Sequence, residues 1–286
     1  MRVSICRLIV MFVLCVSGLC GATQAAELSK QEAAEQRRFA ANNAMFVLYH
    51  EMAHLLIDQL ELPVLGREED VADNMASWTL LNHGTRRAEQ TLTDAVRGWF
   101  LSGVAYASGS TESDFAAAYM LDKQRAYQIV CMMVGKDADS FGRLAATYRI
   151  GPSRRDSCHW DYETVDRSLR SVLDRNGSRN GRGTSVNVTY QAAGGSLRAG
   201  AEAFKASGVF DQVAAELQHR YNLSTPVQFS AKRCGEANAF YDPDSVEIIF
   251  CYELMQDYMN IYADNMVVTD TVRPPIDVRK DKHRRD

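Results

Sequence analysis

The sequence predicts an α+β fold that is mostly helical, with a small β-sheet or hairpin packed on the helix that carries the candidate site. Three observations lead to this prediction. Apolar residues recur with a helical period through residues 28–174. A polar, glycine-rich stretch follows at residues 175–184. Beyond it, the pattern changes to the alternation of apolar and polar side chains that is typical of strands.

The first 25 residues have the composition of a secretory signal peptide. Arg2 and Arg7 precede an apolar run that is too short to span a bilayer, and small residues surround Ala25. We therefore expect cleavage after Ala25 and a periplasmic or secreted product. A leader that is retained as a membrane anchor is the alternative, and a lipid-modified Cys20 is disfavoured by the leucine before it.

Residues 26–174 form the predicted helical region, which is expected to hold the candidate site. The segment from Glu27 to Leu60 contains no glycine or proline and Pro63 follows it, so one long helix is expected there. Further stretches with a helical period lie at residues 69–83 and 113–134. Gly135 is the expected stop signal of the last of these helices.

Residues 185–265 form the predicted second region, which follows a flexible linker. Strands and helices are expected in the order β-α-β-β-α, at residues 186–190, 198–221, 226–230, 246–250 and 252–264. The two regions are expected to pack into one compact domain. The charged tail at residues 266–286 is predicted to be disordered.

The composition excludes several classes of protein. The chain has 32 Lys and Arg against 36 Asp and Glu, a formal net charge of −4. This charge excludes a nucleic-acid binder that works through bulk positive charge. A hydrophobic content of 46% excludes disorder over most of the length. Outside the leader, no stretch is long and apolar enough to cross a membrane, so no stable span is expected after cleavage.

Four cysteines remain once the leader is removed, and an even number in an oxidising compartment predicts disulfides. They are Cys131, Cys158, Cys234 and Cys251, and three pairings are possible. We favour two local pairs, Cys131 with Cys158 and Cys234 with Cys251, because the second pair flanks a predicted hairpin. No Cys-x-x-Cys spacing occurs, which argues against a cysteine zinc site.

The strongest motif is His50-Glu51-Met52-Ala53-His54. On a helix, side chains four residues apart share a face, so both imidazoles can reach one metal ion with Glu51 beside them. This is the H-E-x-x-H zinc motif, in which the glutamate acts as general base toward a metal-activated water. The alternative is two unrelated surface histidines. Apolar residues on both sides of the motif argue against it, because they predict a buried helix whose polar groups need partners.

A catalytic zinc ion needs a third protein ligand. Glu69 and Asp73 share a helical face a short way downstream, after a break that lets a second helix return past the first. We expect Glu69 to take the third position and Asp73 to accept the ring N–H of a ligand histidine. Glu68 and Asp70 are the competing ligands, but their directions on the helix do not suit a pair with Asp73. An acidic, solvated helix start is the alternative interpretation.

The residues of these two motifs resemble those of a known family. His-Glu-x-x-His followed by Glu-x-x-Ala-Asp is similar to the gluzincin class of zinc peptidases. A closer likeness is to a bacterial family described as putative metallopeptidases. The segments that carry it are residues 50–58, 62–73, 234–243 and 250–254. The resemblance implies a zincin-like fold, one Zn²⁺ per chain and a peptide or protein substrate.

The order of the segments departs from that of such peptidases, in which the strands usually precede the zinc helix. Here the strands follow it, so we expect a circularly permuted order, with the junction opened between about residue 265 and residue 30. In that case the hairpin at residues 226–251 must pack against the zinc helix at residues 44–60. The reason is that the helix is apolar on too many faces to stand at a surface.

The predicted function is a zinc-dependent peptidase. Zn²⁺ on His50, His54 and Glu69 polarises the scissile carbonyl and lowers the pKa of a water molecule. Glu51 takes the proton and passes it to the leaving amine.

Asn238, Ala239 and Phe240 form the predicted substrate strand. Their Asn-Ala-Phe sequence is similar to the strand beside the active site of the CAAX-prenyl-type zinc peptidases. An extended peptide can add to the open edge of such a strand. A plain hairpin turn is the alternative interpretation of this segment.

His83, His159 and Tyr241 are the candidates for stabilising the transition state. Two other functions use the same residues: a periplasmic zinc-binding or carrier protein without turnover, and a degenerate peptidase fold that serves as a binding module. The chain lacks the His-rich runs of carriers and keeps all five motif positions, which favours catalysis.

Overall fold

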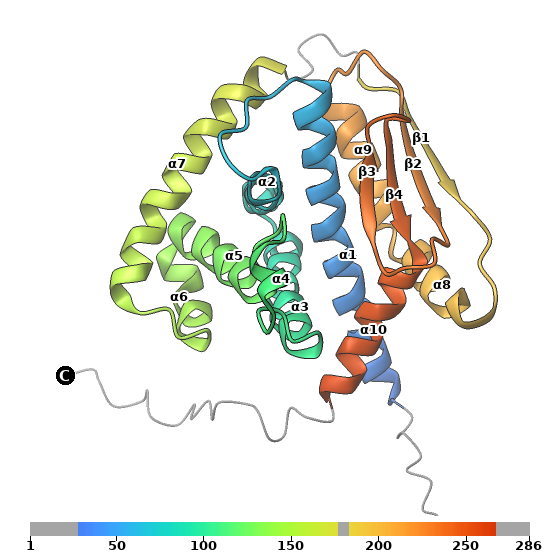
Figure 1. The fold of residues 1–286 in the computed structure, drawn as a ribbon, viewed down its shortest axis with the longest axis horizontal. Helices are drawn as coiled ribbons and strands as arrows, with labels where there is room; N and C mark the ends of the chain where they lie inside the picture. Colours follow the sequence, from blue (N-terminus) through green and yellow to red (C-terminus); the bar gives the residue numbers. More distant parts are fainter. Residues whose placement is uncertain (1–27, 177–182, 267–286) are drawn as a thin grey trace, which may run out of the picture.

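Helix α1 (Lys30–Gln59) lies in the middle of the molecule (Figure 1). Helices α2 (Glu68–His83) and α3 (Arg86–Ala105) lie on one side of it, and the β-sheet and α9 (Val209–Arg220) lie on the other. The computed structural model describes residues 28–176 and 183–266. The expected leader at residues 1–25 lies outside these residues, as do residues 177–182 of the expected linker and 267–286 of the expected tail.

The helical region contains α1 (Lys30–Gln59), α2 (Glu68–His83), α3 (Arg86–Ala105), α4 (Glu112–Phe115), α5 (Asp122–Lys136), α6 (Ala138–Thr147) and α7 (Pro152–Asn176). The second region contains β1 (Val186–Tyr190), the short 3₁₀ helix η1 (Gly195–Leu197), α8 (Arg198–Ser207), α9 (Val209–Arg220), β2 (Val227–Lys232), β3 (Ala239–Asp242), β4 (Glu247–Cys251) and α10 (Tyr252–Met266). The fold is α+β, as predicted.

Helix α1 begins at a capping box, and a left-handed residue follows shortly after its end. The Ser29 hydroxyl accepts from the Glu32 N–H at 3.2 Å, and the Glu32 carboxylate accepts from the Ser29 N–H at 2.8 Å. At the other end, Glu61 has φ 49°, which turns the chain back toward α2. Between these ends, almost every side chain from Phe39 to Ile57 is buried, because other elements pack around the whole helix. The prediction of a buried helix is confirmed.

The sheet has the strand order β1-β2-β4-β3. β1, β2 and β4 are parallel, and β3 is antiparallel to β4 at the edge of the sheet. The expected hairpin across residues 226–251 is therefore wrong in one respect, because its outer strands, β2 and β4, are parallel neighbours. Only β3 and β4 form a hairpin. As expected, β3 and β4 pack against α1.

One face of the sheet is apolar and is covered by α8 and α9. Phe229 on β2 and Phe250 on β4 are fully buried on this face. The Phe250 ring stacks on Phe204 of α8 with 3.9 Å between centroids, and Phe229 contacts Phe210 of α9 at 5.2 Å. These contacts fix the sheet beside α1.

Three expected boundaries differ from the structure. The helix expected at 198–221 is two helices, because Gly208 has φ +66° and ends α8. The helix expected at 113–134 is the short α4 followed by a loop and α5. Gly135 does not stop α5, which continues to Lys136.

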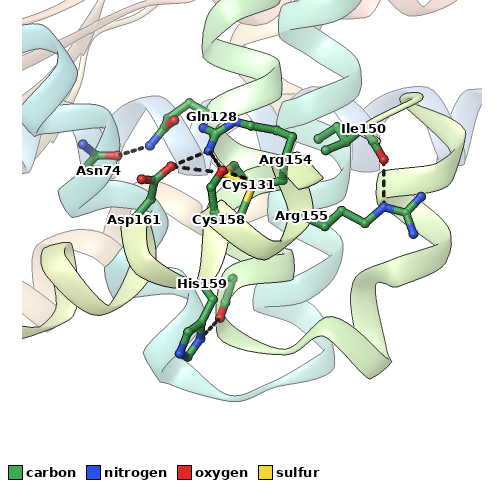
Figure 2. The surroundings of a disulfide bond; sticks show 11 residues. Asn74, Gln128, Cys131, Ile150, Arg154, Arg155, Cys158, His159 and Asp161 are labelled. Atoms are coloured by element: carbon green, nitrogen blue, oxygen red, sulfur yellow. Dashed lines mark hydrogen bonds and ion pairs between the residues drawn. A yellow bond between two sulfur atoms is a disulfide. The ribbon is translucent and has the colours of Figure 1, made fainter. Parts of the chain in front are cut away.

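Gly135 has a packing role where α5 meets α7. A Cβ at this position would lie 2.1 Å from the Cys158 carbonyl oxygen, so only glycine permits the observed approach. The Cys131–Cys158 disulfide joins the two helices at the same level, beside the 2.7 Å ion pair between Arg154 and Asp161 (Figure 2).

The second disulfide joins Cys234 and Cys251, with 5.4 Å between their Cα atoms. It ties the loop after β2 to the end of β4. Both of the favoured cysteine pairs are thus present, and two disulfides fit an extracytoplasmic, oxidising compartment. In the described part of the chain, no helix combines the length and the apolar character needed to span a bilayer.

A polar network that includes Tyr49 of α1 links the two regions. Glu216 of α9 accepts hydrogen bonds from the Tyr49 hydroxyl at 2.5 Å and from Arg220 Nη1 at 2.7 Å. His83 Nε2 lies 3.0 Å from the same carboxylate. Burial raises the pKa of Glu216, but these partners lower it to about 2. We call this group the Glu216 network.

Candidate metal centre

Two imidazole rings project from one face of α1 toward α2. His50 is 4% exposed and His54 is partly buried, one helical turn further along. The 3.6-residue period places their rings beside each other, with 4.7 Å between centroids. The two Nε2 atoms lie 3.1 Å apart.

Helix α2 brings the first carboxylate to these rings. Its first turn holds three acidic residues, which suit the positive end of a helix. Glu69 Oε2 lies 3.1 Å from His50 Nε2 and 3.5 Å from His54 Nε2. His50, His54 and Glu69 are thereby grouped with their ligand atoms within 4.8 Å of one another.

This triangle matches the dimensions of a zinc site. Ligand atoms at about 2.1 Å from a tetrahedral zinc ion lie about 3.4 Å from each other. The three observed separations are 3.1, 3.1 and 3.5 Å. Two imidazoles and one carboxylate are also a donor set that binds zinc in catalytic sites. The residues present therefore fit the metal without a change of backbone.

The charges of the triangle are set by its own contacts. Burial lowers the pKa of His50, but the carboxylates of Asp73 and Glu69 outweigh it and raise the pKa to about 9. Burial raises the pKa of Glu69, whereas hydrogen bonds from His50 and His54 lower it to about 2. Glu69 is therefore ionised at neutral pH and offers an anionic oxygen to a cation.

Asp73 lies behind His50 and orients its ring. Its Oδ1 accepts from His50 Nδ1 at 2.9 Å, which leaves Nε2 directed toward Glu69. Asp73 is itself held by Arg125 of α5, whose Nε and Nη2 donate to Oδ2 and Oδ1, each at 2.7 Å. The guanidinium lies 3.6 Å above the Trp99 ring. Four side chains from four helices thus form one buried chain of contacts.

Glu68 has the same role toward the second histidine. Its Oε1 accepts from His54 Nδ1 at 2.7 Å, so Nε2 of this ring also faces Glu69. Asp70, the other competing ligand, pairs instead with Arg67 at 3.0 Å. The geometry therefore places Glu69, rather than Glu68 or Asp70, at the third corner.

Glu51 lies between the histidines and the edge of the sheet. The backbone N–H of Tyr241 on β3 donates to Glu51 Oε2 at 2.9 Å. The carboxylate is 6% exposed, and burial raises its pKa above the ordinary value. A buried carboxylate that holds a proton more readily suits proton transfer near neutral pH.

The edge strand β3 presents part of its backbone away from β4. The register pairs Ala239 with Phe250, and Cys251 N–H donates to the Asn238 carbonyl at 3.0 Å. Hydrogen-bonded and non-hydrogen-bonded residue pairs alternate along two antiparallel strands, so the N–H and C=O groups of Ala239 and Tyr241 point away from β4. The outward N–H of Ala239 donates to the Asn238 side chain at 2.9 Å.

The triangle, Glu51 and the edge strand line one cleft of about 1150 Å³. It contains His50, His54, Glu51 and Glu69 at one wall and the three expected substrate residues, Asn238, Ala239 and Phe240, at another.

The three transition-state candidates are not brought together. Tyr241 lines the cleft, and its hydroxyl donates to Asp58 at 2.7 Å. His83 belongs to the Glu216 network. His159 lies on α7, with Nδ1 3.4 Å from the Gly135 carbonyl oxygen, and does not line the cleft (Figure 2).

Three supporting contacts were missed by the sequence analysis. These are Glu68 on His54, Arg125 on Asp73, and the Tyr241 N–H on Glu51. Glu68 was considered only as a ligand. Arg125 carries no spacing signal, since 52 residues separate it from Asp73. A backbone N–H leaves no mark in a sequence.

The model of a family described as "Putative metallopeptidase" matches residues 9–173 and 191–280. No curated protein and no solved structure matches the chain.

Proposed function

We propose that this chain, which belongs to the family described as putative metallopeptidases, is a zinc-dependent peptidase. The observation that supports this most is the triangle of His50, His54 and Glu69, whose separations suit a tetrahedral zinc ion. We propose one Zn²⁺ per chain at this triangle. Zinc bound there would act as a Lewis acid and lower the pKa of water to about 7.

Glu51 is the proposed general base. Its carboxylate lies beside the ligand histidines on α1 and within the cleft, and the Tyr241 N–H fixes one oxygen. The other oxygen can accept a proton from water, because Glu51 is buried and its pKa is raised. The same carboxyl group then gives the proton to the leaving amine.

The substrate is a peptide or protein that lies along β3. Backbone groups of Ala239 point outward from the sheet, next to Glu51, so an extended chain can pair with them. We propose that Asn238, Ala239 and Phe240 position the scissile bond in this way. The Asn238 side chain, which accepts from Ala239, must turn aside when a peptide takes that hydrogen bond.

We propose that the leader is removed near Ala25 and that the mature protein acts in the periplasm or outside the cell. The two disulfides support an oxidising compartment. N-terminal sequencing of the exported protein checks this. A product that begins at Met1 contradicts it.

The proposed activity is tested with the Glu51→Gln variant. The amide keeps the size of the side chain but does not accept the proton, so hydrolysis of a mixed peptide library should fall by about 10²- to 10⁴-fold while zinc is retained. Glu61→Gln is the matched control, because Glu61 is exposed and lies outside the cleft.

The same assay separates peptidase activity from zinc storage. A zinc-loaded wild type that cleaves no peptide, or a Glu51→Gln variant as active as wild type, contradicts the proposed mechanism. Retained zinc without hydrolysis in the wild type would instead indicate a zinc-binding protein.

A further inference from the structure

Beyond the metal centre, the cleft continues to a wall formed by α3, the start of α5 and α10. Five residues define this wall: Ser102 on α3, Tyr106 directly after α3, Asp122 on α5, and Asp257 and Tyr258 on α10. None of them belongs to the metal site or to the strand proposed to hold the substrate. We call this group the acidic end of the cleft.

Its two carboxylates are paired only with neutral donors. Asp122 Oδ2 accepts from the Ser102 hydroxyl at 2.7 Å, and Asp257 Oδ1 accepts from the Tyr106 hydroxyl at 2.5 Å. Within residues 28–176 and 183–266, no lysine or arginine forms an ion pair with either carboxylate. Burial and the nearby carboxylates of Asp257 and Asp122 raise the pKa of the Tyr106 hydroxyl to about 12. Ser102 and Tyr106 lie one helical turn apart, with the Tyr106 N–H donating to the Ser102 carbonyl, so the two carboxylates that they hold are neighbours without a paired cation.

Tyr258 provides an independent sign that a ligand belongs here. The residue is 9% exposed and lines the cleft. Its hydroxyl has no hydrogen-bond partner among the residues that the structure describes. Among the described residues, the buried polar side-chain atoms without a partner are Asp70 Oδ1 and Gln256 Oε1, so the Tyr258 hydroxyl is accessible from the cleft and free to accept a hydrogen bond from a ligand there. Tyr258 lines the same cleft as Asp122 and Asp257.

The negative charge of the whole cleft also favours a cationic ligand. Its walls hold seven carboxylates: Glu51, Asp58, Glu68, Glu69, Asp114, Asp122 and Asp257. Its two arginines, Arg67 and Arg125, are each paired with an acid, at 3.0 and 2.7 Å. A cleft lined by one sign of charge attracts ligands of the opposite sign. Even with a divalent cation at the triangle, carboxylates remain unmatched at the acidic end.

We propose that the acidic end binds the cationic side chain of a lysine or arginine in the peptide substrate. This proposal rests on the proposed peptidase function and gives the substrate class of the same site. A lysine ammonium has three donors, and the acidic end offers three acceptors: a free oxygen of Asp122, a free oxygen of Asp257 and the Tyr258 hydroxyl. The methylene stem of the side chain packs against the Tyr106 ring.

Equilibrium binding tests this without requiring hydrolysis. The full chain with Glu51→Gln, loaded with zinc, is titrated with fluorescent peptides that carry lysine, norleucine or glutamate at each position in turn. At one position or more, the lysine peptide should bind at least about tenfold more tightly than the norleucine peptide, as expected for charge-assisted hydrogen bonds. The preference should shrink as salt is raised from 0.01 to about 1 M.

Variants assign the preference to the acidic end. Asp122→Asn combined with Asp257→Asn should reduce the lysine preference to about twofold or less, and Tyr258→Phe should reduce it in part. Asp139→Asn is the matched control, because Asp139 is exposed on α6 and lies outside the cleft. Asp257→Lys should move the preference toward the glutamate peptide. Thermal unfolding of each variant verifies that it is folded.

The outcomes separate this inference from the proposed activity. Equal binding of lysine and norleucine peptides, or a preference that survives both asparagine substitutions, overturns the inference. A lysine preference without cleavage by the wild type supports the acidic end and overturns the peptidase. Cleavage of all three peptides at equal kcat/KM supports the peptidase and overturns the acidic end. The inference is also overturned if the acidic end binds a divalent cation and shows no preference among the three peptides.

Discussion

Replacing Arg125 with methionine should destabilise the protein and loosen the metal site together. Arg125 donates two hydrogen bonds of 2.7 Å to Asp73, and the two side chains are 7% and 4% exposed. Burial raises the pKa of Asp73, but Arg125 and His50 hold it well below its ordinary value. Without Arg125, the buried carboxylate lacks its positive partner.

The expected loss follows from this geometry. Removing one partner of a buried, hydrogen-bonded ion pair costs about 3–5 kcal/mol, because the remaining charge is left without compensation. Arg125 donates two hydrogen bonds to Asp73 and also contacts Trp99. We therefore expect Arg125→Met to lower the free energy of unfolding by about 4 kcal/mol. Asp73 also orients His50, and a loosened contact of this kind lowers zinc affinity by about 10- to 100-fold.

Urea unfolding of the zinc-stripped protein at pH 7 measures the first effect, and competition with a chelator measures the second. Arg154→Met is the control, because Arg154 makes a 2.7 Å ion pair with Asp161 at an exposed site. An exposed pair contributes less than about 1 kcal/mol. If Arg125→Met changes the free energy of unfolding by no more than Arg154→Met does, the buried pair does not have the role assigned to it.

Three further predictions concern the ligand, acid stability and the second disulfide. Glu69→Ala should abolish tight zinc binding while Asp70→Ala retains it; the reverse result in elemental analysis would move the third ligand. The pKa of Glu216 is lowered from 4.5 to about 2, so its charge stabilises the fold above pH 4.5, and this stability is lost as pH falls toward 2. Across this window the wild type should lose about 3 kcal/mol more than Glu216→Gln, in which the other carboxylates still titrate, as measured by unfolding at each pH; parallel curves would contradict this. Joint replacement of Cys234 and Cys251 by serine should lower the free energy of unfolding by about 3 kcal/mol, since the bond closes a loop with a separation of 17 residues; an unchanged urea midpoint would contradict this.

The short intervals between its residues allowed the metal site to be predicted from the sequence. His50, His54, Glu69 and Asp73 are fixed by two helices and the short turn between them, so residue intervals of four are sufficient to place them. The preference for Glu69 over Glu68 also followed from helix direction. The structure then shows that Glu68 supports His54 instead.

Contacts between distant segments were harder to predict. Arg125 reaches Asp73 only because α5 packs against α2. The parallel pairing of β2 with β4 depends on where β3 folds back, and alternation of apolar residues does not distinguish parallel from antiparallel neighbours. The end of α8 depends on Gly208, whose left-handed conformation is allowed but not required by its type. A permuted segment order stays a prediction.

The central claim, a zinc ion on His50, His54 and Glu69, is tested most directly by metal stoichiometry. Native mass spectrometry with elemental analysis is applied to the purified mature protein and to His54→Ala. We predict one zinc ion per wild-type chain and its loss from His54→Ala, because the variant lacks one corner of the triangle. A wild-type protein without zinc, or a variant with equal zinc content, would contradict the account.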